Sequence, residues 1–486
     1  MPNPNLHHTI PVLLLFTLLL SSSCKEDEVR KGAEIITKEI LGCTNPLSES
    51  YDPKATTNDG SCAATDCSTC NFFISGDVFG FDGVKKGVKP GDIICLDGTV
   101  TYKEPLSLSN IVGTADNPVL IINCGGQAVI DMSSKNASYA IRTSGSKYFR
   151  ISGAGSNDHE YGIVLSNTKS LGISLDGLSS NFEVDHLEIF EIGFAGIMSK
   201  TDPSCDAATQ RDNFVMQDIS IHDNYVHDTG GEGLYIGNSF YEKGRNLTDC
   251  GTVFPHDIKG ADIYRNKVIN AGWEAIQVGC GVEGVKIHDN YIENYGTENE
   301  TYQNNGLQIG EGTGGLLYNN YIAKGPGNGV IMLGLGDNIM FNNVIVNAGE
   351  SGVFCDERYT PGDGFSFINN TIINPEENGI VIYAEKVPLN HVINNVIVNP
   401  GAYKSEPEKA YIKKLNNDVK IDIAANFFTQ DIAAAGFEAD GYLLSADSEL
   451  IDTGEDVSDF GVTFDFIGTD RPSGTGFDPG AYEYKQ

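Results

Sequence analysis

Two glutamates are the first candidates for chemistry in this sequence. Glu232 and Glu274 each stand eight residues after an asparagine, Asn224 and Asn266, in two similar segments. Carboxyl groups one repeat apart repel each other, which raises one pKa and suits a proton donor beside an ionised partner. A retaining glycosidase needs such groups about 5 Å apart and an inverting one needs them further apart. The alternative is that both cap turn amides, like the Asn and Ser residues at this place in later segments.

Other residues nearby offer different chemistry. With the two glutamates, Asn305 and Glu311 could hold calcium, a hard cation that takes carboxylate and amide oxygens. A polysaccharide lyase instead needs a base and a cation, for which Lys243 and Arg245 are candidates in a predicted loop. His227, beside an aspartate and ahead of a Gly-Gly pair, is placed for acid–base work.

A polar row is predicted on the strands that follow these glutamates. Tyr235, Gln277 and Gln308 occupy the outward position of successive strands, whereas later strands have apolar residues there. The long insertions fall in the same segments, so we expect a trough that holds an extended polymer, with Glu232 and Glu274 within it. Trp273 could stack on a sugar ring there or pack in the turn.

The elements that position these residues repeat along the chain. An Asn, a short Val/Ile-rich run, a Gly-containing turn and a second apolar run recur about every 24 residues, with longer gaps where loops are inserted. This period predicts an all-β solenoid of stacked parallel coils rather than a leucine-rich repeat, because no helical periodicity occurs between the runs. The asparagines are expected to form an internal ladder: Asn224, Asn266, Asn290, Asn320, Asn343, Asn370 and Asn395.

Two segments carry a resemblance to a known group. Residues 89–132, "KPGDIICLDGTVTYKEPLSLSNIVGTADNPVLIINCGGQAVIDM", and the tail "LIDTGEDVSDFGVTFDFIGTDRPSGTGFDPGAYEY" resemble secreted bacterial proteins with the right-handed parallel β-helix, or pectin-lyase-like, fold. That group includes chondroitinase B-like and alginate lyases, so the resemblance implies a cell-surface protein that acts on polysaccharide as a lyase or glycoside hydrolase. Because the fold also hosts adhesins, the alternative is a non-catalytic glycan-binding or adhesive protein.

The charge balance excludes some partners. With 32 basic and 66 acidic residues the formal net charge is −34, which argues against nucleic acid and against an anionic membrane surface as partners. An anionic polysaccharide would be repelled unless calcium or a local basic patch intervened.

The N-terminus indicates export. An apolar run, "IPVLLLFTLLL", ends in "SSSC" with Cys24 followed by "KEDE", which resembles a bacterial lipoprotein signal. The resemblance implies a lipid on Cys24 that anchors the protein in the outer membrane at the cell surface. The alternative is an ordinary signal peptide and a secreted protein.

The remaining ten cysteines are an even number, which allows disulfides in an exported chain. Cys43 and Cys62 bracket an Asp/Asn-rich segment that resembles a short Cys-closed module of bacterial surface proteins, which implies a bond between them. Cys67–Cys70 and Cys205–Cys250 are the other expected pairs, the second because both residues leave adjacent coils on one side. Zinc is the weaker alternative, because a single CxxC motif lacks four ligands.

These observations divide the chain into five parts. We expect a signal peptide at 1–23, a lipid-anchored tether at 24–41, the Cys-closed module at 42–71, the parallel β-helix at 77–400 and a closing segment at 401–486.

Overall fold

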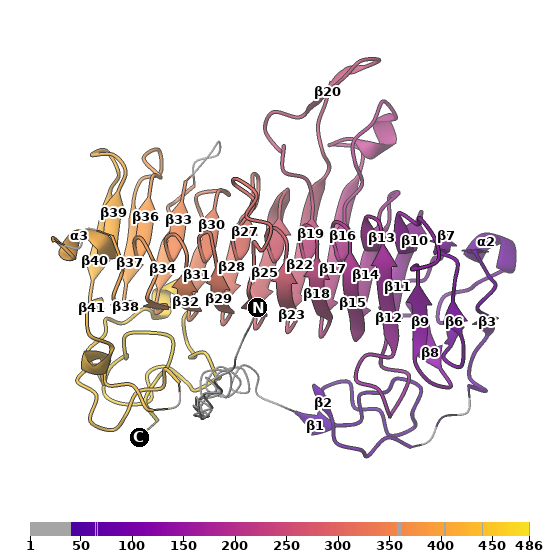
Figure 1. Ribbon diagram of the computed structural model, residues 1–486, viewed down its shortest axis with the longest axis horizontal. Helices are drawn as coiled ribbons and strands as arrows, with labels where there is room; N and C mark the ends of the chain where they lie inside the picture. The colour runs from indigo at the N-terminus through magenta and orange to yellow at the C-terminus, as the bar shows by residue number, and fades with distance from the viewer. Residues whose placement is uncertain are drawn as a thin grey trace, which may run out of the picture.

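The chain winds into a long parallel β-helix, described here from a computed structural model (Figure 1). The structure describes residues 40–63, 65, 67–356, 362–402, 405–439 and 441–485. The predicted leader, the tether up to residue 39 and Cys24 therefore lie outside the described residues. No helix in the described part of the chain is long and apolar enough to cross a bilayer.

Each coil contributes one strand to each of three parallel sheets, which we name A, B and C in the order in which a coil visits them. Sheet A contains β4 (Gly80–Asp82), β7 (Leu106–Ser109), β10 (Tyr139–Ser144), β13 (Leu171–Leu175), β16 (Ile197–Ser199), β19 (Leu234–Ile236), β24 (Ile276–Val278), β27 (Leu307–Ile309), β30 (Val330–Met332), β33 (Val353–Cys355), β36 (Ile380–Ile382) and β39 (Ile412–Lys414).

Sheet B contains β3 (Phe72–Ile74), β5 (Ile93–Asp97), β8 (Val119–Cys124), β11 (Lys147–Ser152), β14 (Ser180–Asp185), β17 (Val215–His222), β22 (Asp257–Tyr264), β25 (Gly281–His288), β28 (Gly315–Tyr318), β31 (Ile339–Phe341), β34 (Ser366–Ile368), β37 (Asn390–Ile393) and β40 (Ile421–Ala424). Sheet C contains β6 (Thr101–Tyr102), β9 (Ala128–Asp131), β12 (Ile163–Thr168), β15 (Leu187–Ile192), β18 (Tyr225–Thr229), β23 (Lys267–Ala271), β26 (Tyr291–Glu293), β29 (Tyr321–Gly325), β32 (Val344–Ala348), β35 (Thr371–Ile373), β38 (Val396–Val398) and β41 (Phe427–Thr429).

The remaining elements are short. They are the parallel pair β1 (Leu41–Gly42) and β2 (Thr57–Asn58), the antiparallel pair β20 (Arg245–Leu247) and β21 (Gly251–Val253), the helices α2 (Gly83–Lys86) and α3 (Glu408–Tyr411), and the 3₁₀ turns η1 (Ala207–Thr209), η2 (Ile432–Ala435) and η3 (Ser458–Phe460). The stack of coils runs from β3 to β41, so its last coil lies within the segment expected to close the helix.

The core is a column of aliphatic side chains that point inward from all three sheets. In β19, for example, Leu234 and Ile236 are fully buried inside, and the same positions of β24 and β27 hold Ile, Val and Leu. Because side chains alternate along a strand, the middle residue of each such strand points outward. No single coil has enough apolar area to be stable alone, so each is stabilised by the coils above and below.

The expected asparagine ladder is confirmed at the turn from sheet B to sheet C. The side-chain oxygen of Asn320 accepts the backbone N–H of Asn290 at 3.2 Å, and the Asn320 amide donates to the side chain of Asn343 at 2.9 Å. The ladder extends one coil further than expected, to Asn426. The left-handed backbone conformation falls on the residue before each ladder asparagine, such as Asn319 with φ 53°, and not on the ladder residue itself.

The C-terminal segment covers the side of the last coils. Leu444, Leu450, Phe466 and Tyr482 pack on the outer face of sheet C around Val344 and its neighbours. Backbone carbonyls of this segment also accept hydrogen bonds from the residues that precede the ladder, as Phe464 does from Asn342 at 2.7 Å. The segment therefore joins several coils and shields an apolar sheet face that would otherwise be exposed.

Four disulfides occur among the described cysteines. Cys43–Cys62 and Cys205–Cys250 are confirmed, but the expected Cys67–Cys70 pair is wrong: Cys67 bonds Cys124 and Cys70 bonds Cys95. The reason is that the chain before β3 runs alongside β5 and β8, so that both cysteines pack against Cys95 and Cys124 of sheet B. These bonds also leave no free thiolates there for zinc, and Cys280 and Cys355 are buried and unbridged.

Candidate functional site

The outer face of sheet A holds a hydrogen-bonded polar row. Tyr235, Gln277 and Gln308 are direct neighbours on β19, β24 and β27, as the sequence predicts. The Gln308 amide donates to the Gln277 side-chain oxygen at 3.0 Å, and the Gln277 amide donates to the Ser239 hydroxyl at 3.4 Å. The exposed Ser239 also bonds the Tyr235 hydroxyl at 2.8 Å. The row therefore runs along the helix axis over three coils. Tyr235, Gln277 and Gln308 are themselves buried, at 8%, 2% and 9% exposed, and the row reaches solvent at Ser239.

A lysine lies at one end of this row. Lys200 follows β16, and its ammonium lies 4.3 Å from the centre of the Tyr235 ring and 3.1 Å from a carboxylate oxygen of Asp202. It also donates to the Asn238 side-chain oxygen at 3.4 Å. Burial disfavours the charge, but Tyr235 and Asp202 more than offset this effect, so the pKa of Lys200 lies above its usual value. Lys200 thus supplies a fixed positive charge beside a phenol hydroxyl.

Aromatic rings border the row at the turns that lead into sheet A. Phe194 makes edge contacts with the Tyr235 ring, at 6.2 Å between centroids, and with the Trp273 ring, at 5.4 Å. Both Phe194 and Trp273 are half-buried. Trp273 therefore packs in the turn and also flanks the outer face of sheet A.

Two insertions, residues 200–214 and 237–256, lie beside the row and are joined by the Cys205–Cys250 disulfide. They form the arm that contains β20 and projects from the upper side of the helix in Figure 1. At its base the Arg211 guanidinium lies 3.8 Å from the Tyr241 ring centre and donates to the Tyr241 carbonyl oxygen. Lys243 and Arg245 lie out on the arm with exposed side chains.

The two glutamates that the sequence singled out lie inside the coil and not on its outer face. They are one coil apart, as expected, but Glu232 is 2% exposed and Glu274 is 0% exposed. Burial raises the pKa of Glu232 to about 8 and that of Glu274 to about 7. One carboxyl oxygen of each has no hydrogen-bond partner. The expected trough with both carboxyl groups on its surface is therefore not what the structure shows.

The glutamates begin a second internal column, at the turn from sheet C to sheet A. The Asn305 amide donates to Glu274 at 3.1 Å, and the Asn305 side-chain oxygen accepts the backbone N–H of Asn328 at 3.2 Å. The column continues through Ser351, whose backbone N–H donates to Asn328 at 3.3 Å. In the later coils the column thus bonds backbone N–H groups of the turn, and Glu274 bonds the Asn305 side chain.

The residues considered for calcium are not gathered in one place. Asn305 precedes β27 and contacts Glu274, but Glu311 follows β27, at the opposite end of a three-residue strand. The Glu311 carbonyl oxygen accepts from the backbone N–H of Cys280 in the loop beyond sheet A. A strand of this length separates its ends by roughly 10 Å, too far for ligands of one ion at 2.3–2.6 Å.

His227 belongs to another face. It lies on β18 in sheet C, stacks on Tyr225 at 4.2 Å and on Phe190 at 5.1 Å, and contacts Asp228 at 2.7 Å. The polar row lies on a different sheet, sheet A. Sequence reasoning missed Phe194, Ser239 and Asn238, which complete the row. Of these three residues, only Phe194 could have been found from the sequence. It stands just before the Ala-Gly turn into β16, at the position that Trp273 occupies two coils later.

Comparison with known proteins agrees with this architecture. The family model for the right-handed β-helix region matches residues 253–428. No match was found among curated protein sequences. Among solved structures, pectate lyase Pel9A is 14% identical with a TM-score of 0.45, over 85% of this chain and 96% of that one. A lacto-N-biosidase from Eubacterium ramulus is 14% identical with a TM-score of 0.47, over 74% and 67%.

An alginate lyase from Paenibacillus sp. is 15% identical with a TM-score of 0.37, over 74% of this chain and 99% of that one. Identities this low leave the activity open. The chain is a right-handed parallel β-helix protein with a disulfide-bonded module at its N-terminal end.

Proposed function

We propose that this protein binds a polysaccharide along the outer face of sheet A, over β16, β19, β24 and β27, and cleaves it there as a lyase. The polar row of Tyr235, Gln277 and Gln308 carries this proposal. Its amides and hydroxyls recur at the coil spacing of about 4.8 Å, roughly the length of a sugar residue, and so suit an extended chain of sugars. Phe194 and Trp273 add apolar ring surface at the border, where the face of a sugar can pack.

The lyase chemistry rests on Lys200 and Tyr235. An elimination removes the proton beside a sugar carboxylate, stabilises the resulting enolate and protonates the leaving glycosidic oxygen. In the proposed reaction Lys200 pairs with the substrate carboxylate and stabilises the enolate as negative charge grows on it. The Tyr235 oxygen, linked to Ser239, takes the proton from the carbon beside the carboxylate while its own proton passes to the leaving glycosidic oxygen, so the C–O bond breaks and the hydroxyl is restored. A uronate-containing substrate therefore meets a local positive charge on a protein whose formal net charge is −34.

A non-catalytic glycan-binding or adhesive protein is the second candidate. The position of Glu232 and Glu274 favours it over a glycoside hydrolase, because both belong to the internal column and not to the outer face of sheet A. The same polar row would then serve recognition alone.

We also propose that the protein is displayed on the outer membrane through a lipid on Cys24. The four disulfides support an oxidising compartment outside the cytoplasm. Replacing Cys24→Ser should move the protein from the membrane fraction to the soluble fraction. If the variant stays in the membrane fraction, the lipid anchor is wrong.

The experiment for the activity is a screen of purified protein against uronate-rich and neutral polysaccharides. Ultraviolet absorbance detects the unsaturated ends that a lyase makes, and a reducing-sugar assay detects any cleavage. Tyr235→Phe and Lys200→Met should each abolish the absorbance signal while the melting temperature stays near that of the wild type. Tyr383→Phe is the matched control, because Tyr383 is 42% exposed on a later coil.

Absorbance at full rate in Tyr235→Phe would contradict the assigned roles. Retention on a polysaccharide with no product in either assay would establish the binding protein instead of the enzyme.

A further inference from the structure

A cavity of about 350 Å³ lies between the Cys-closed module and the β-helix. We propose that this cavity is a second carbohydrate site, separate from the outer face of sheet A, and that it takes one or two rings of a neutral sugar. One wall is Thr56–Asn58 of the module, another is the loop 156–161 after β11, and the floor contains His186, Asp223 and Arg265 from turns of the β-helix.

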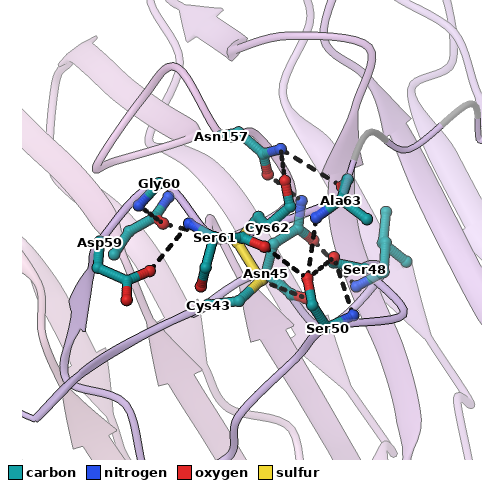
Figure 2. The surroundings of a disulfide bond; sticks show 12 residues. Cys43, Asn45, Ser48, Ser50, Asp59, Gly60, Ser61, Cys62, Ala63 and Asn157 are labelled. Atoms are coloured by element: carbon teal, nitrogen blue, oxygen red, sulfur yellow. Dashed lines mark hydrogen bonds between the residues drawn. A yellow bond between two sulfur atoms is a disulfide. The ribbon is translucent and has the colours of Figure 1, made fainter.

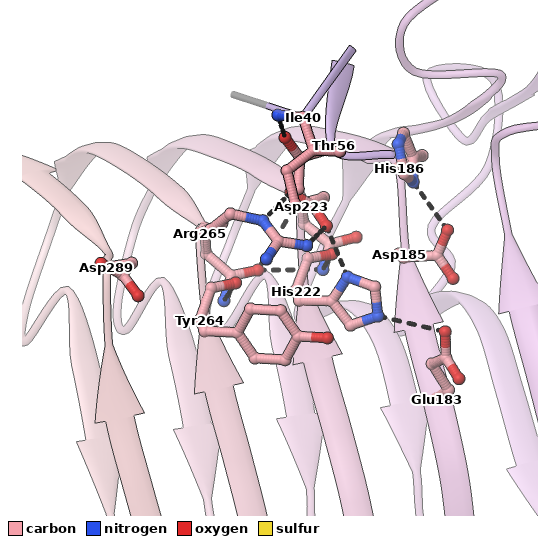
Figure 3. A network of polar contacts seen from close by, with 12 residues as sticks. Ile40, Thr56, Glu183, Asp185, His186, His222, Asp223, Tyr264, Arg265 and Asp289 are labelled. Carbon is pink, nitrogen blue, oxygen red and sulfur yellow. Dashed lines mark hydrogen bonds and ion pairs between the residues drawn. The ribbon is translucent and has the colours of Figure 1, made fainter. Parts of the chain in front are cut away.

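The floor is held in place by a network of ion pairs (Figure 3). Arg265 donates to both oxygens of Asp223, at 2.7 and 2.6 Å, and His222 contacts the same carboxylate at 2.6 Å. Burial alone would raise the pKa of Asp223, but His222 and Arg265 lower it well below its usual value, so the carboxylate stays ionised. His186 is held in the same way by Asp185 at 2.7 Å.

The module wall is also fixed to the helix. The Asn45 amide donates to the side-chain oxygen of Asn157 at 2.9 Å, and the Asn157 amide donates to the Cys62 carbonyl oxygen at 3.4 Å (Figure 2). Arg150 donates to the Tyr51 hydroxyl at 3.4 Å. The Cys67–Cys124 and Cys70–Cys95 bonds tie the following segment to sheet B. Walls held this firmly reduce the entropy lost when a ligand is ordered between them.

The chemistry of the walls selects the class of ligand. The charges on the floor are already paired, so the cavity offers hydroxyls, amides and neutralised ion pairs, which match the hydroxyl groups of a sugar. An anionic ligand would meet Asp158 and Glu160 on the loop and a strongly acidic protein. The half-buried Tyr161 supplies a ring on which a sugar face can pack.

A metal ion is the other ligand to consider, because Glu183, Asp185 and His222 bring donor atoms within 4.8 Å of one another. The Arg150 guanidinium already occupies this group, at 3.0 Å from Glu183 and 2.7 Å from Asp185. A divalent cation would have to displace it and leave its charge unpaired. A volume of about 350 Å³ lies at the lower end of the range for small-molecule sites and suits one or two sugar rings.

Saturation-transfer NMR on the full chain tests this proposal, with the methyl glycosides of glucose, galactose and mannose at millimolar concentration as probes. Ser156→Trp places a large ring in the cavity and should abolish saturation transfer. Asp116→Trp, on an exposed loop outside the cavity, is the matched control and should retain it. Gln277→Ala should also retain it, which separates this site from the sheet A face and makes the result independent of the proposed lyase activity.

Tyr161→Leu serves as the second variant if Ser156→Trp fails to fold, and should weaken binding roughly three- to tenfold. The proposal is overturned if none of the three glycosides shows saturation transfer to the wild-type protein. It is also overturned if the folded Ser156→Trp variant binds as the wild type does, or if Tyr161→Leu leaves the affinity unchanged.

Discussion

Replacing Glu232→Gln should make the protein more stable at alkaline pH. In the folded state burial raises the pKa of Glu232 from 4.5 to about 8. The folded protein therefore holds this proton between those two pH values and the unfolded chain does not, so stability falls as pH rises from about 4.5 to about 8. At 1.36 kcal/mol per pKa unit, the rise of about 3.5 units corresponds to roughly 5 kcal/mol lost by pH 9.

Glutamine has nearly the same shape and no charge, so the variant avoids this loss. Its free energy of unfolding should exceed that of the wild type by roughly 3–5 kcal/mol at pH 9 and should equal it within about 1 kcal/mol at pH 5. Urea unfolding followed by circular dichroism at the two pH values measures the difference. Glu298→Gln is the control, because replacing this exposed carboxylate should change the free energy of unfolding by the same small amount at both pH values.

Two outcomes would refute this reasoning. If the free energies of wild type and Glu232→Gln change in parallel between pH 5 and pH 9, Glu232 does not titrate from a buried position. If the variant instead loses turnover on a glycan with no change in stability at pH 9, Glu232 acts as the catalytic carboxylate that its spacing first suggested.

Three further predictions follow from the contacts. Asn320→Ala should lower the free energy of unfolding by roughly 2–4 kcal/mol in urea, because the amide donates to Ile287, Tyr318 and Asn343; a loss below about 1 kcal/mol would contradict the ladder's role. The double variant Cys205→Ser, Cys250→Ser should speed proteolytic cleavage within residues 237–256 while cleavage elsewhere is unchanged; equal cleavage rates would show that the disulfide does not hold the arm. Chelation with EDTA should leave the melting temperature unchanged, because Glu311 is separated from the other residues considered for calcium; a clear fall on chelation would show a calcium site.

Much of the fold could be predicted from the sequence because every coil of a solenoid repeats the same packing and hydrogen-bonding requirements. Each ladder asparagine bonds backbone groups of its own turn and of the preceding coil, and also the side chain of the next ladder asparagine, so its spacing gave the register of the coils. That register alone placed Tyr235, Gln277 and Gln308 side by side. The Cys205–Cys250 bond followed from the same register, because both insertions leave adjacent coils at the same edge.

The side of the coil on which the glutamates lie was harder to predict. Glu232 stands two residues before Leu234, which points inward, so strand alternation would have placed it inside. The turn from sheet C to sheet A intervenes, and the polarity of glutamate suggested an outward position. The structure shows that this turn keeps the alternation, and later coils fill the same column with Asn and Ser.

Contacts between distant segments could not be predicted at all. The partners of Cys67 and Cys70 depend on how the chain before β3 lies against β5 and β8, which no repeat encodes. The cavity beneath the module likewise brings together Thr56–Asn58 and Arg265, which are far apart in sequence and belong to no common period.

Hydrogen–deuterium exchange of the full chain, with and without the polysaccharide that the screen identifies, tests the central claim most directly. We predict added protection in β19, β24 and β27 and in the loops 200–214 and 237–256 that border the polar row. Protection confined to the outer faces of sheets B and C, or to the coils after β30, would contradict it.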